Sequence, residues 1–188
     1  MKTMNLKTLA AAAVIMLSVG LHAQTMDNTV MVGGESMYPT KNIVENAVNS
    51  KKHTTLIAAV KAAGLVETLQ SKGPFTVFAP VNDAFSALPA GTVETLLKPE
   101  NKATLTKVLT YHVVSGKYDY AALEKLITAG KGTGMLKTVS GGTLWVMKNG
   151  MHNIIVKDEM GNVATISTYD VNQSNGVIHV IDTVLMPK

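Results

Sequence analysis

The sequence predicts a single α+β domain, and three observations support that prediction. Before Gly130, apolar residues recur at the three- and four-residue intervals that are typical of helices. After Gly130, short apolar runs alternate with glycine and asparagine turns, as in β-hairpins. Within the first half, residues 73–85 form one strand-like stretch that leads directly into a helix start. Helices followed by mostly antiparallel strands indicate an α+β fold.

Residues 1–23 are typical of a bacterial signal peptide. Lys2 and Lys7 supply positive charge, residues 9–19 are almost entirely apolar, and Ala23 is the small residue that signal peptidase requires. The apolar run is shorter than a bilayer span, so we expect no membrane-spanning segment after cleavage. Because the chain has no cysteine, it has neither a thiol for lipid attachment nor a disulfide. We therefore expect residues 24–188 to be periplasmic or secreted.

The charge pattern does not favour nucleic acid as a partner. Lys2 and Lys7 account for two of the four formal positive charges, so residues 24–188 are only slightly basic. All basic side chains are lysines, and they are scattered along the chain. Phosphate and guanine recognition favours the bidentate fork of arginine, usually in clusters. We expect no nucleic acid partner.

Residues 24–40 predict a flexible lead-in to a domain that spans residues 41–188. This segment contains Gly33-Gly34 and Pro39 and has no hydrophobic period. A short helical stripe then begins at Asn42, and a second helix ends at Gly64. Thr54 or Thr55 is the expected N-cap of this second helix.

Further helices are expected from apolar spacing at residues 65–69, 93–97 and 105–112, and after Asp119 as an N-cap. His112 falls on the apolar face of the 105–112 helix. A histidine in that position is more often a hydrogen-bonded core residue than a base or a ligand. We interpret His112 as a core residue.

Residues 73–85, GPFTVFAPVNDAF, are the strongest structural signal in the chain. Pro80 cannot donate to a sheet ladder and so limits the strand. Asn82 is expected to cap the helix that follows. The stretch contains every phenylalanine of the chain, namely Phe75, Phe78 and Phe85. We expect them to form one packing nucleus, with an aromatic ligand platform as the alternative.

Five strands are expected after Gly130, at residues 135–139, 143–147, 154–157, 163–169 and 177–186. The predicted hairpin turns between them are Gly141-Gly142, Asn149-Gly150, Gly161-Asn162 and Asn175-Gly176. Both faces of the last strand are apolar. We therefore expect it to be central in the sheet.

Catalytic and metal-binding patterns are weak. A Gly-x-Ser-x-Gly motif is absent, and His179 and Asp182 would point to opposite faces of a strand. The histidines form no His-x-His or His-x-x-x-His pair. Asp158-Glu159 lacks the alternating oxygen ligands of a calcium loop. We expect no catalytic residue, no metal and no cofactor.

Three motifs in the right order resemble the fasciclin-type domain. The first is residues 73–85, the second is the Tyr111-His112 pair, and the third is SNGVIHVIDTVLMP at residues 174–187, which contains Asn175, Gly176 and His179. The resemblance covers about residues 42–187. Val81 stands where the family commonly has threonine, which removes one capping hydroxyl.

The resemblance implies a wedge or sandwich of β-strands flanked by helices and a non-enzymatic role in adhesion. From animal members it implies a binding region at Tyr111, His112, Asp170 and Val171. We expect an exported module that binds a polysaccharide or protein of a cell surface or matrix. The alternative is a carrier of a lipophilic small molecule, since some fasciclin-like proteins hold pigments.

Overall fold

The computed structural model describes residues 29–188, so the predicted signal peptide and residues 24–28 lie outside the described residues. The helices are α1 (Ile43–Ala47), α2 (Thr54–Ala63), α3 (Val66–Gln70), α4 (Asn82–Ser86), α5 (Thr92–Leu97), the 3-10 helix η1 (Pro99–Asn101), α6 (Lys102–Tyr111) and α7 (Tyr120–Ala129). The strands are β1 (Val30–Val32), β2 (Glu35–Met37), β3 (Phe75–Pro80), β4 (Val113–Ser115), β5 (Thr133–Lys137), β6 (Thr143–Asn149), β7 (Asn153–Lys157), β8 (Val163–Gln173) and β9 (Gly176–Ile181).

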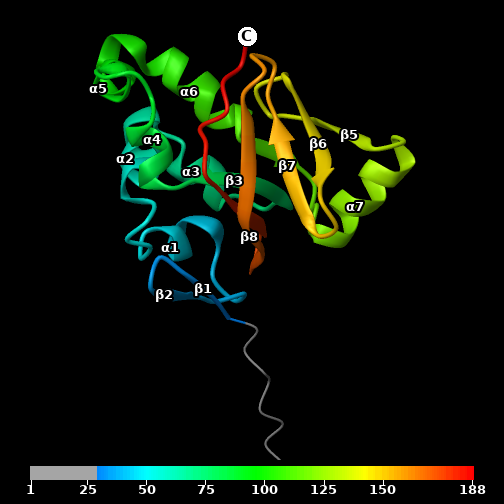
Figure 1. Ribbon diagram of the computed structural model, residues 1–188. Coiled ribbons are helices and arrows are strands. Elements are labelled where there is room, and N and C mark those ends of the chain that lie inside the picture. Colours follow the sequence, from blue (N-terminus) through cyan, green and yellow to red (C-terminus); the bar gives the residue numbers. More distant parts are fainter. Residues whose placement is uncertain (1–28) are drawn as a thin grey trace, which may run out of the picture.

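One seven-stranded sheet organises the domain, in the order β4-β3-β9-β8-β7-β6-β5. Strands β3 and β9 are parallel, and the other neighbouring pairs are antiparallel. Helices α1 to α6 lie to one side of the strands and α7 to the other (Figure 1). The expected α+β fold is confirmed, as is the central place of the last strand.

The sheet separates two hydrophobic clusters. Val77 and Ala79 of β3 belong to a cluster that includes side chains of α1, α2, α3 and α6, whereas Phe78 belongs to a second cluster. The second cluster contains Leu123 and Ile127 of α7 and the inward side chains of β5 to β8. Alternate residues of a strand point to opposite faces, which explains why neighbours in β3 enter different clusters.

The same alternation corrects the expected phenylalanine nucleus. Phe78 is completely buried in the second cluster, but Phe75 is only partly buried and packs against the first. Phe85 packs partly against the first cluster and partly against a small third cluster around Val108. The three rings therefore stabilise different parts of the fold. They do not form one nucleus.

Asn82 caps a helix, but not the helix that it begins. Its Oδ1 accepts hydrogen bonds from the Thr55 backbone N–H at 3.1 Å and the Thr54 hydroxyl at 3.2 Å, both at the start of α2. Its Nδ2 donates to the Lys51 carbonyl at 2.9 Å. The N-cap position of α2 is His53, which makes no side-chain cap. Asn82 thus performs the capping that had been expected of Thr54 or Thr55.

The N-terminal lead-in is partly regular, which corrects the expectation for residues 30–37. Strands β1 and β2 form an antiparallel hairpin. Its turn contains Gly33 and Gly34, whose φ angles of 64° and 84° favour glycine. Val32 and Met37 are buried in the first cluster. The glycine pair therefore marks a hairpin turn.

The ends of the last two strands differ from the expected ones. Strand β8 continues to Gln173 through irregular register, and β9 ends at Ile181, well before Met186. Beyond β9 the chain is irregular, yet Leu185 is fully buried in the second cluster. The capping role expected of Asp119 is confirmed, because its side chain accepts a hydrogen bond from the Ala122 N–H at 2.9 Å.

We predict that Phe78→Ala lowers the free energy of unfolding by about 3–5 kcal/mol, since it removes a fully buried ring. Phe75→Ala should cost clearly less, because Phe75 is already partly exposed. Urea unfolding of both variants measures the difference. Equal losses, or an unchanged midpoint for Phe78→Ala, would contradict the division into two clusters.

Candidate functional site

Tyr111 is the last residue of α6, and its side chain is completely buried. The phenol donates to the Thr143 carbonyl at 2.8 Å and accepts from the Glu159 backbone N–H at 3.0 Å. Burial raises the pKa of Tyr111 to about 12, so the phenol keeps its proton near neutral pH. Tyr111 therefore links α6 to the start of β6 and to the turn after β7.

His112 is a core residue, as expected. Its Nδ1 donates to the Val108 carbonyl at 2.9 Å, and its Nε2 accepts from the Leu185 backbone N–H at 2.9 Å. Burial lowers the pKa of His112 from its ordinary value of 6.5 to about 4. The neutral ring uses both nitrogens and holds the C-terminal segment against α6.

Asp170 and Val171 lie at an irregularity in β8, where the register with β9 shifts. Asp170 has a φ of 55°, which brings its Oδ1 within 2.7 Å of the Tyr120 N–H at the start of α7. Its own N–H donates to His179 Nδ1 at 3.4 Å. Val171 is buried in the first cluster. Both residues make internal contacts between β8 and its neighbours.

His179 occupies the centre of the sheet. Its Nε2 donates to the Tyr118 carbonyl at 2.7 Å, and its ring stacks on Phe78 with a centroid separation of 5.7 Å. Burial lowers the pKa of His179. Asp182 is engaged elsewhere and accepts from the Thr165 N–H at 2.8 Å. His179 and Asp182 thus have separate partners.

The structure does not bring the four residues of the expected binding region together at one exposed surface. Tyr111, His112 and Val171 are each at most 3% exposed, and Asp170 is partly buried. Tyr111 contacts the β6 side of the sheet, whereas Asp170 contacts α7 and His179. Their role in binding stays a prediction, while the contacts that they make are internal.

Asn175 and Gly176 of the third motif contact the segments before the first motif and the start of β3. The Asn175 side chain donates to the Leu69 and Ser71 carbonyls at 2.8 and 3.0 Å and accepts from the Ile43 N–H at 3.0 Å. A Cβ atom at Gly176 would overlap the backbone of Phe75. Glycine is therefore required where β9 begins beside β3.

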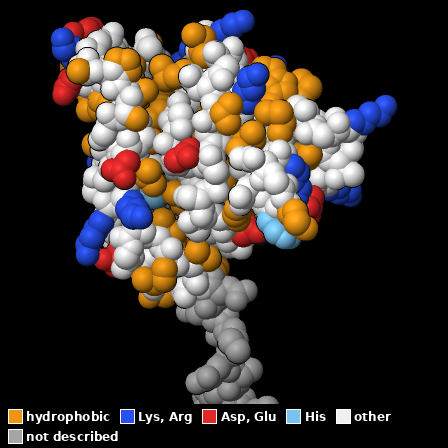
Figure 2. Space-filling model, viewed as in Figure 1, with side chains coloured by type: hydrophobic (Ala, Val, Ile, Leu, Met, Phe, Trp, Pro, Cys, Tyr) orange, Lys and Arg blue, Asp and Glu red, His pale blue; other side chains and the backbone are white. Residues whose placement is uncertain are grey.

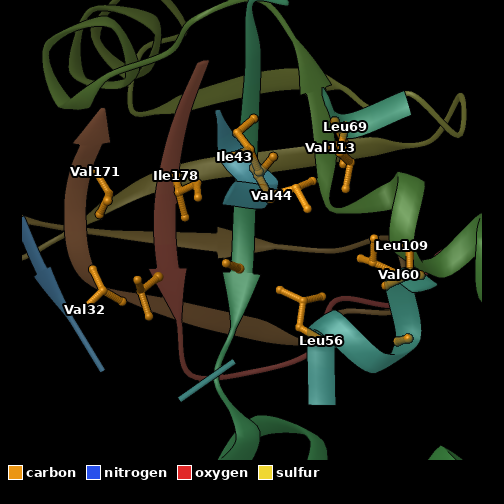
Figure 3. Close-up of a cluster of buried hydrophobic side chains, with 14 of the residues drawn as sticks. Val32, Ile43, Val44, Leu56, Val60, Leu69, Leu109, Val113, Val171 and Ile178 are labelled. Carbon is orange, nitrogen blue, oxygen red and sulfur yellow. The ribbon is translucent and has the colours of Figure 1, made fainter. Parts of the chain in front are cut away.

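The first cluster, whose side chains Figure 3 shows, borders an apolar cavity of about 70 Å³. Ser50 and His53 are polar residues in its lining, and Ser50 Oγ lies 2.8 Å from His53 Nδ1. Burial lowers the pKa of His53, partly offset by the nearby Ala79 carbonyl. Nevertheless His53 Nε2 has no partner with hydrogen-bond geometry. This cavity is a candidate for a small apolar molecule with one polar group.

A second candidate site is the outward surface of strands β5 to β8, which we name the Trp145 face. One row of directly paired residues crosses it, in the order Met135, Trp145, Lys157 and Val163. The adjacent row is Thr133, Met147, Ile155 and Thr165. Residues that alternate with these, such as Leu144 and Val146, point inward to the second cluster, where α7 packs.

The Trp145 face leaves apolar side chains accessible. Met135 is 62% exposed and Val163 is 45% exposed. A shallow groove of about 420 Å³ runs beside Trp145, between Met147 and Met160 and the polar side chains of Lys157 and Glu159. Figure 2 shows hydrophobic side chains gathered at the surface over the upper ends of β6 and β7. Contiguous exposed apolar area of this kind is typical of interaction surfaces.

Sequence reasoning did not single out the Trp145 face. The signal was present in the alternation of Leu144 and Val146 with Trp145 and Met147. That alternation separates two faces of a strand. It does not show which face a helix covers, and here α7 covers the inner one.

Within residues 29–188, no three histidine, aspartate or glutamate side chains are grouped closely enough to hold a metal ion. Over the same residues, every helix is too short or too polar to cross a membrane.

The fold and the Trp145 face together define an α+β scaffold that presents one open strand surface. A family model described as "Fasciclin domain" matches residues 51–187. Protein sll1483 of Synechocystis sp. is 46% identical to this chain over 165 residues, which cover 87% of this chain and 83% of that protein. The chain belongs to the fasciclin domain family.

Two further similarities support this assignment. Immunogenic protein MPB70 of Mycobacterium bovis is 38% identical over 146 residues, covering 75% of this chain and 66% of that protein. The solved structure of a FAS1 domain pair from the insect cell adhesion molecule fasciclin I matches with a TM-score of 0.70 at 17% identity. That match covers 79% of this chain and 52% of the other chain, and it shows a shared fold.

We predict that acidification destabilises the protein below about pH 6.5. Burial lowers the pKa values of His53, His112 and His179, so the unfolded chain binds more protons than the folded one as pH falls. The stabilisation from a neutral His112 is fully present above pH 6.5. It is lost as the pH falls toward about 4, the pKa of His112 in the folded protein. Each histidine contributes a slope of up to about 1.4 kcal/mol per pH unit.

Urea unfolding at a series of pH values from neutral to mildly acidic measures this slope. His112→Gln should reduce it, although the variant is also less stable at neutral pH. A free energy of unfolding that stays constant from neutral pH to pH 5 would contradict the buried neutral state of these histidines.

Proposed function

We propose that this protein is a non-enzymatic adhesion module that acts outside the cytoplasm and binds a polysaccharide or protein of a cell surface or matrix. The observation that supports this proposal most is the Trp145 face, an open strand surface with a half-buried aromatic ring at a groove and an exposed methionine. Tryptophan and methionine are enriched in the interiors of binding interfaces. An open face of this kind suits a broad surface contact.

The buried polar groups support a scaffold role over a catalytic one. His112 and His179 each use both ring nitrogens for internal hydrogen bonds. The Tyr111 hydroxyl likewise has one donor and one acceptor partner within the fold. A general acid or base needs a nitrogen or oxygen that can reach a substrate. These groups stabilise the domain instead.

The family and the predicted export signal agree with this proposal. The solved fasciclin I structure comes from a cell adhesion molecule, and this chain shares its fold. A signal peptide at residues 1–23 would deliver residues 24–188 to the periplasm or the medium. There the exposed face would meet surface and matrix polymers.

The apolar cavity supports a second candidate function, the carriage of a lipophilic small molecule. His53 Nε2 is buried without a hydrogen-bond partner at this cavity and could meet a hydroxyl or carboxyl group. The cavity volume of about 70 Å³ argues against this function, because it is too small for a lipophilic molecule of ordinary size. A cavity that binds a molecule as small as benzene has a volume of about 150 Å³. A long lipophile would therefore require α1, α2 and α3 to move outward.

Native mass spectrometry of protein purified from its source, beside an organic extract of the same sample, separates these two functions. An empty chain supports adhesion. A stoichiometric lipophile would support the carrier function and overturn the adhesion proposal as the main activity.

We predict that Met135→Asp weakens binding to source cells or their matrix by about tenfold, since it places a charge directly beside Trp145 on the β5 edge of the Trp145 face. The matched control is Met151→Asp, because Met151 is 84% exposed but lies in the turn beyond β6. A second control is Tyr111→Phe, which should keep binding while losing stability. A pull-down with labelled residues 24–188 measures all three. Lost binding in Tyr111→Phe with normal binding in Met135→Asp would contradict the proposal.

A further inference from the structure

We propose that the Trp145 face binds an acidic polysaccharide, with uronic acid polymers as the simplest case. A sugar ring would stack on Trp145, and carboxylates of the polymer would pair with Lys137 and Lys157. This inference rests on the proposed adhesion function. It adds the chemical class of the partner and the residues that recognise it.

The register of the sheet places the two lysines on opposite sides of the indole. Lys157 on β7 is directly paired with Trp145 on β6. Lys137 on β5 is paired with Thr143, which is two residues from Trp145 on the same face. The row from Met135 to Val163 spans four strands, or about 14 Å at the usual strand separation. The face therefore offers an aromatic centre with a cation on each side.

Both lysine side chains are available for a partner. Lys137 and Lys157 are exposed, and within residues 29–188 the salt bridges are Lys51 with Glu35 and Lys148 with Glu124. Neither lysine of the face takes part in them. Within the described residues no carboxylate forms a salt bridge with either ammonium group, so both can pair with an external anion.

The two acidic residues that follow Lys157 in the chain accept hydrogen bonds from backbone amides. Asp158 is 1% exposed and accepts from the Asn162 and Met186 N–H groups at 2.7 and 2.8 Å. Glu159 accepts from the Thr143 and Lys188 N–H groups at 2.9 and 3.3 Å. These bonds engage both carboxylates within the protein, and Glu159 also borders the groove beside Trp145. They leave the lysines as the cations that a ligand meets on the open face.

The positive charges of Lys137 and Lys157 favour an acidic partner for the Trp145 face over a neutral or apolar one. A neutral polymer or an apolar protein patch could cover Trp145 and Met135, but it would bury the ammonium groups of Lys137 and Lys157 without partners. Burial of an unpaired charge is costly. An acidic polysaccharide avoids this cost, because a sugar ring has an apolar face for the indole and a rim of hydroxyl and carboxylate groups. The groove combines apolar and polar side chains in the same way.

Binding at the Trp145 face can be followed by tryptophan fluorescence, because Trp145 is the only tryptophan in the chain. The full exported chain, purified from its source, is titrated with polygalacturonate while tryptophan emission is recorded. We expect a saturable change in emission with polygalacturonate, a weaker response at high salt, and no response to neutral dextran. Because no other tryptophan contributes, the signal reports contact near the Trp145 face.

Variants test the role of the charges. Lys137→Gln combined with Lys157→Gln should weaken polygalacturonate binding at least tenfold. Lys125→Gln is the matched control, since Lys125 is an exposed residue of α7, on the opposite side of β5 and β6. Isothermal titration calorimetry gives the affinity of each variant, including Trp145→Phe, which should also bind more weakly. An equal loss in Lys125→Gln would overturn the inference, as would binding without a change in Trp145 emission.

The test also separates this inference from the function on which it rests. Normal adhesion to cells or matrix without polygalacturonate binding would overturn the acidic polysaccharide and leave adhesion in place. A protein partner whose binding is lost in Met135→Asp and is unaffected by polygalacturonate would likewise overturn the acidic polysaccharide and leave adhesion in place. Failure to bind cells, matrix and polygalacturonate alike would overturn both proposals.

Discussion

The parallel pairing of β3 with β9 is the contact on which the rest of this structure depends. It joins segments about one hundred residues apart, from Phe75 beside Gly176 to Pro80 beside Ile181. On one side of the pair, Val77 and Val180 enter the first cluster, and on the other Phe78 stacks on His179. Without this pairing neither cluster would close, because each contains residues from both strands.

Two asparagines that flank the paired strands hydrogen-bond to the backbone of neighbouring helices. Asn82, just after β3, caps α2, and Asn175, just before β9, binds backbone atoms next to α1 and α3. Tyr111 and His112 connect α6 to β6 and to the C-terminal segment in a similar way. Polar residues from each of the three motifs, namely Asn82, Tyr111, His112 and Asn175, therefore make internal hydrogen bonds. We propose that a partner is recognised by other residues, since the Trp145 face provides an aromatic ring and two exposed lysines.

Much of the fold could be predicted from the sequence, because its local signals agree with its tertiary contacts. Apolar spacing located α6 and placed His112 in the core, and the glycine and asparagine turns located the hairpins of the second half. One error arose where a contact joins distant segments, and another where a short hairpin carries few apolar residues. Asn82 was expected to cap its own helix, and only the folded chain shows that the start of α2 lies beside it. Gly33 and Gly34 suggested an irregular segment, although they form the turn of a hairpin whose buried residues are few.

The candidate site was harder to predict than the fold. The family resemblance pointed to Tyr111, His112, Asp170 and Val171. Apolar spacing already placed His112 in the core, whereas the burial of Tyr111 and Val171 becomes evident only from tertiary packing. Conversely, Trp145 alternates with buried neighbours in the sequence, but a sequence pattern cannot show that α7 covers one face of β6 and leaves the other open. Exposure is a property of the whole fold, so an interaction face is less visible in the sequence than a core.

The central claim is that recognition takes place on the open strand face and that the Tyr-His region is structural. Amide chemical-shift mapping of residues 24–188 during titration with polysaccharide extracted from the source cells tests this claim most directly. We expect the perturbed amides to lie in β5, β6 and β7, with little change at Tyr111, His112, Asp170 and Val171. Perturbations centred on those four residues, with β5 to β7 unaffected, would contradict the claim.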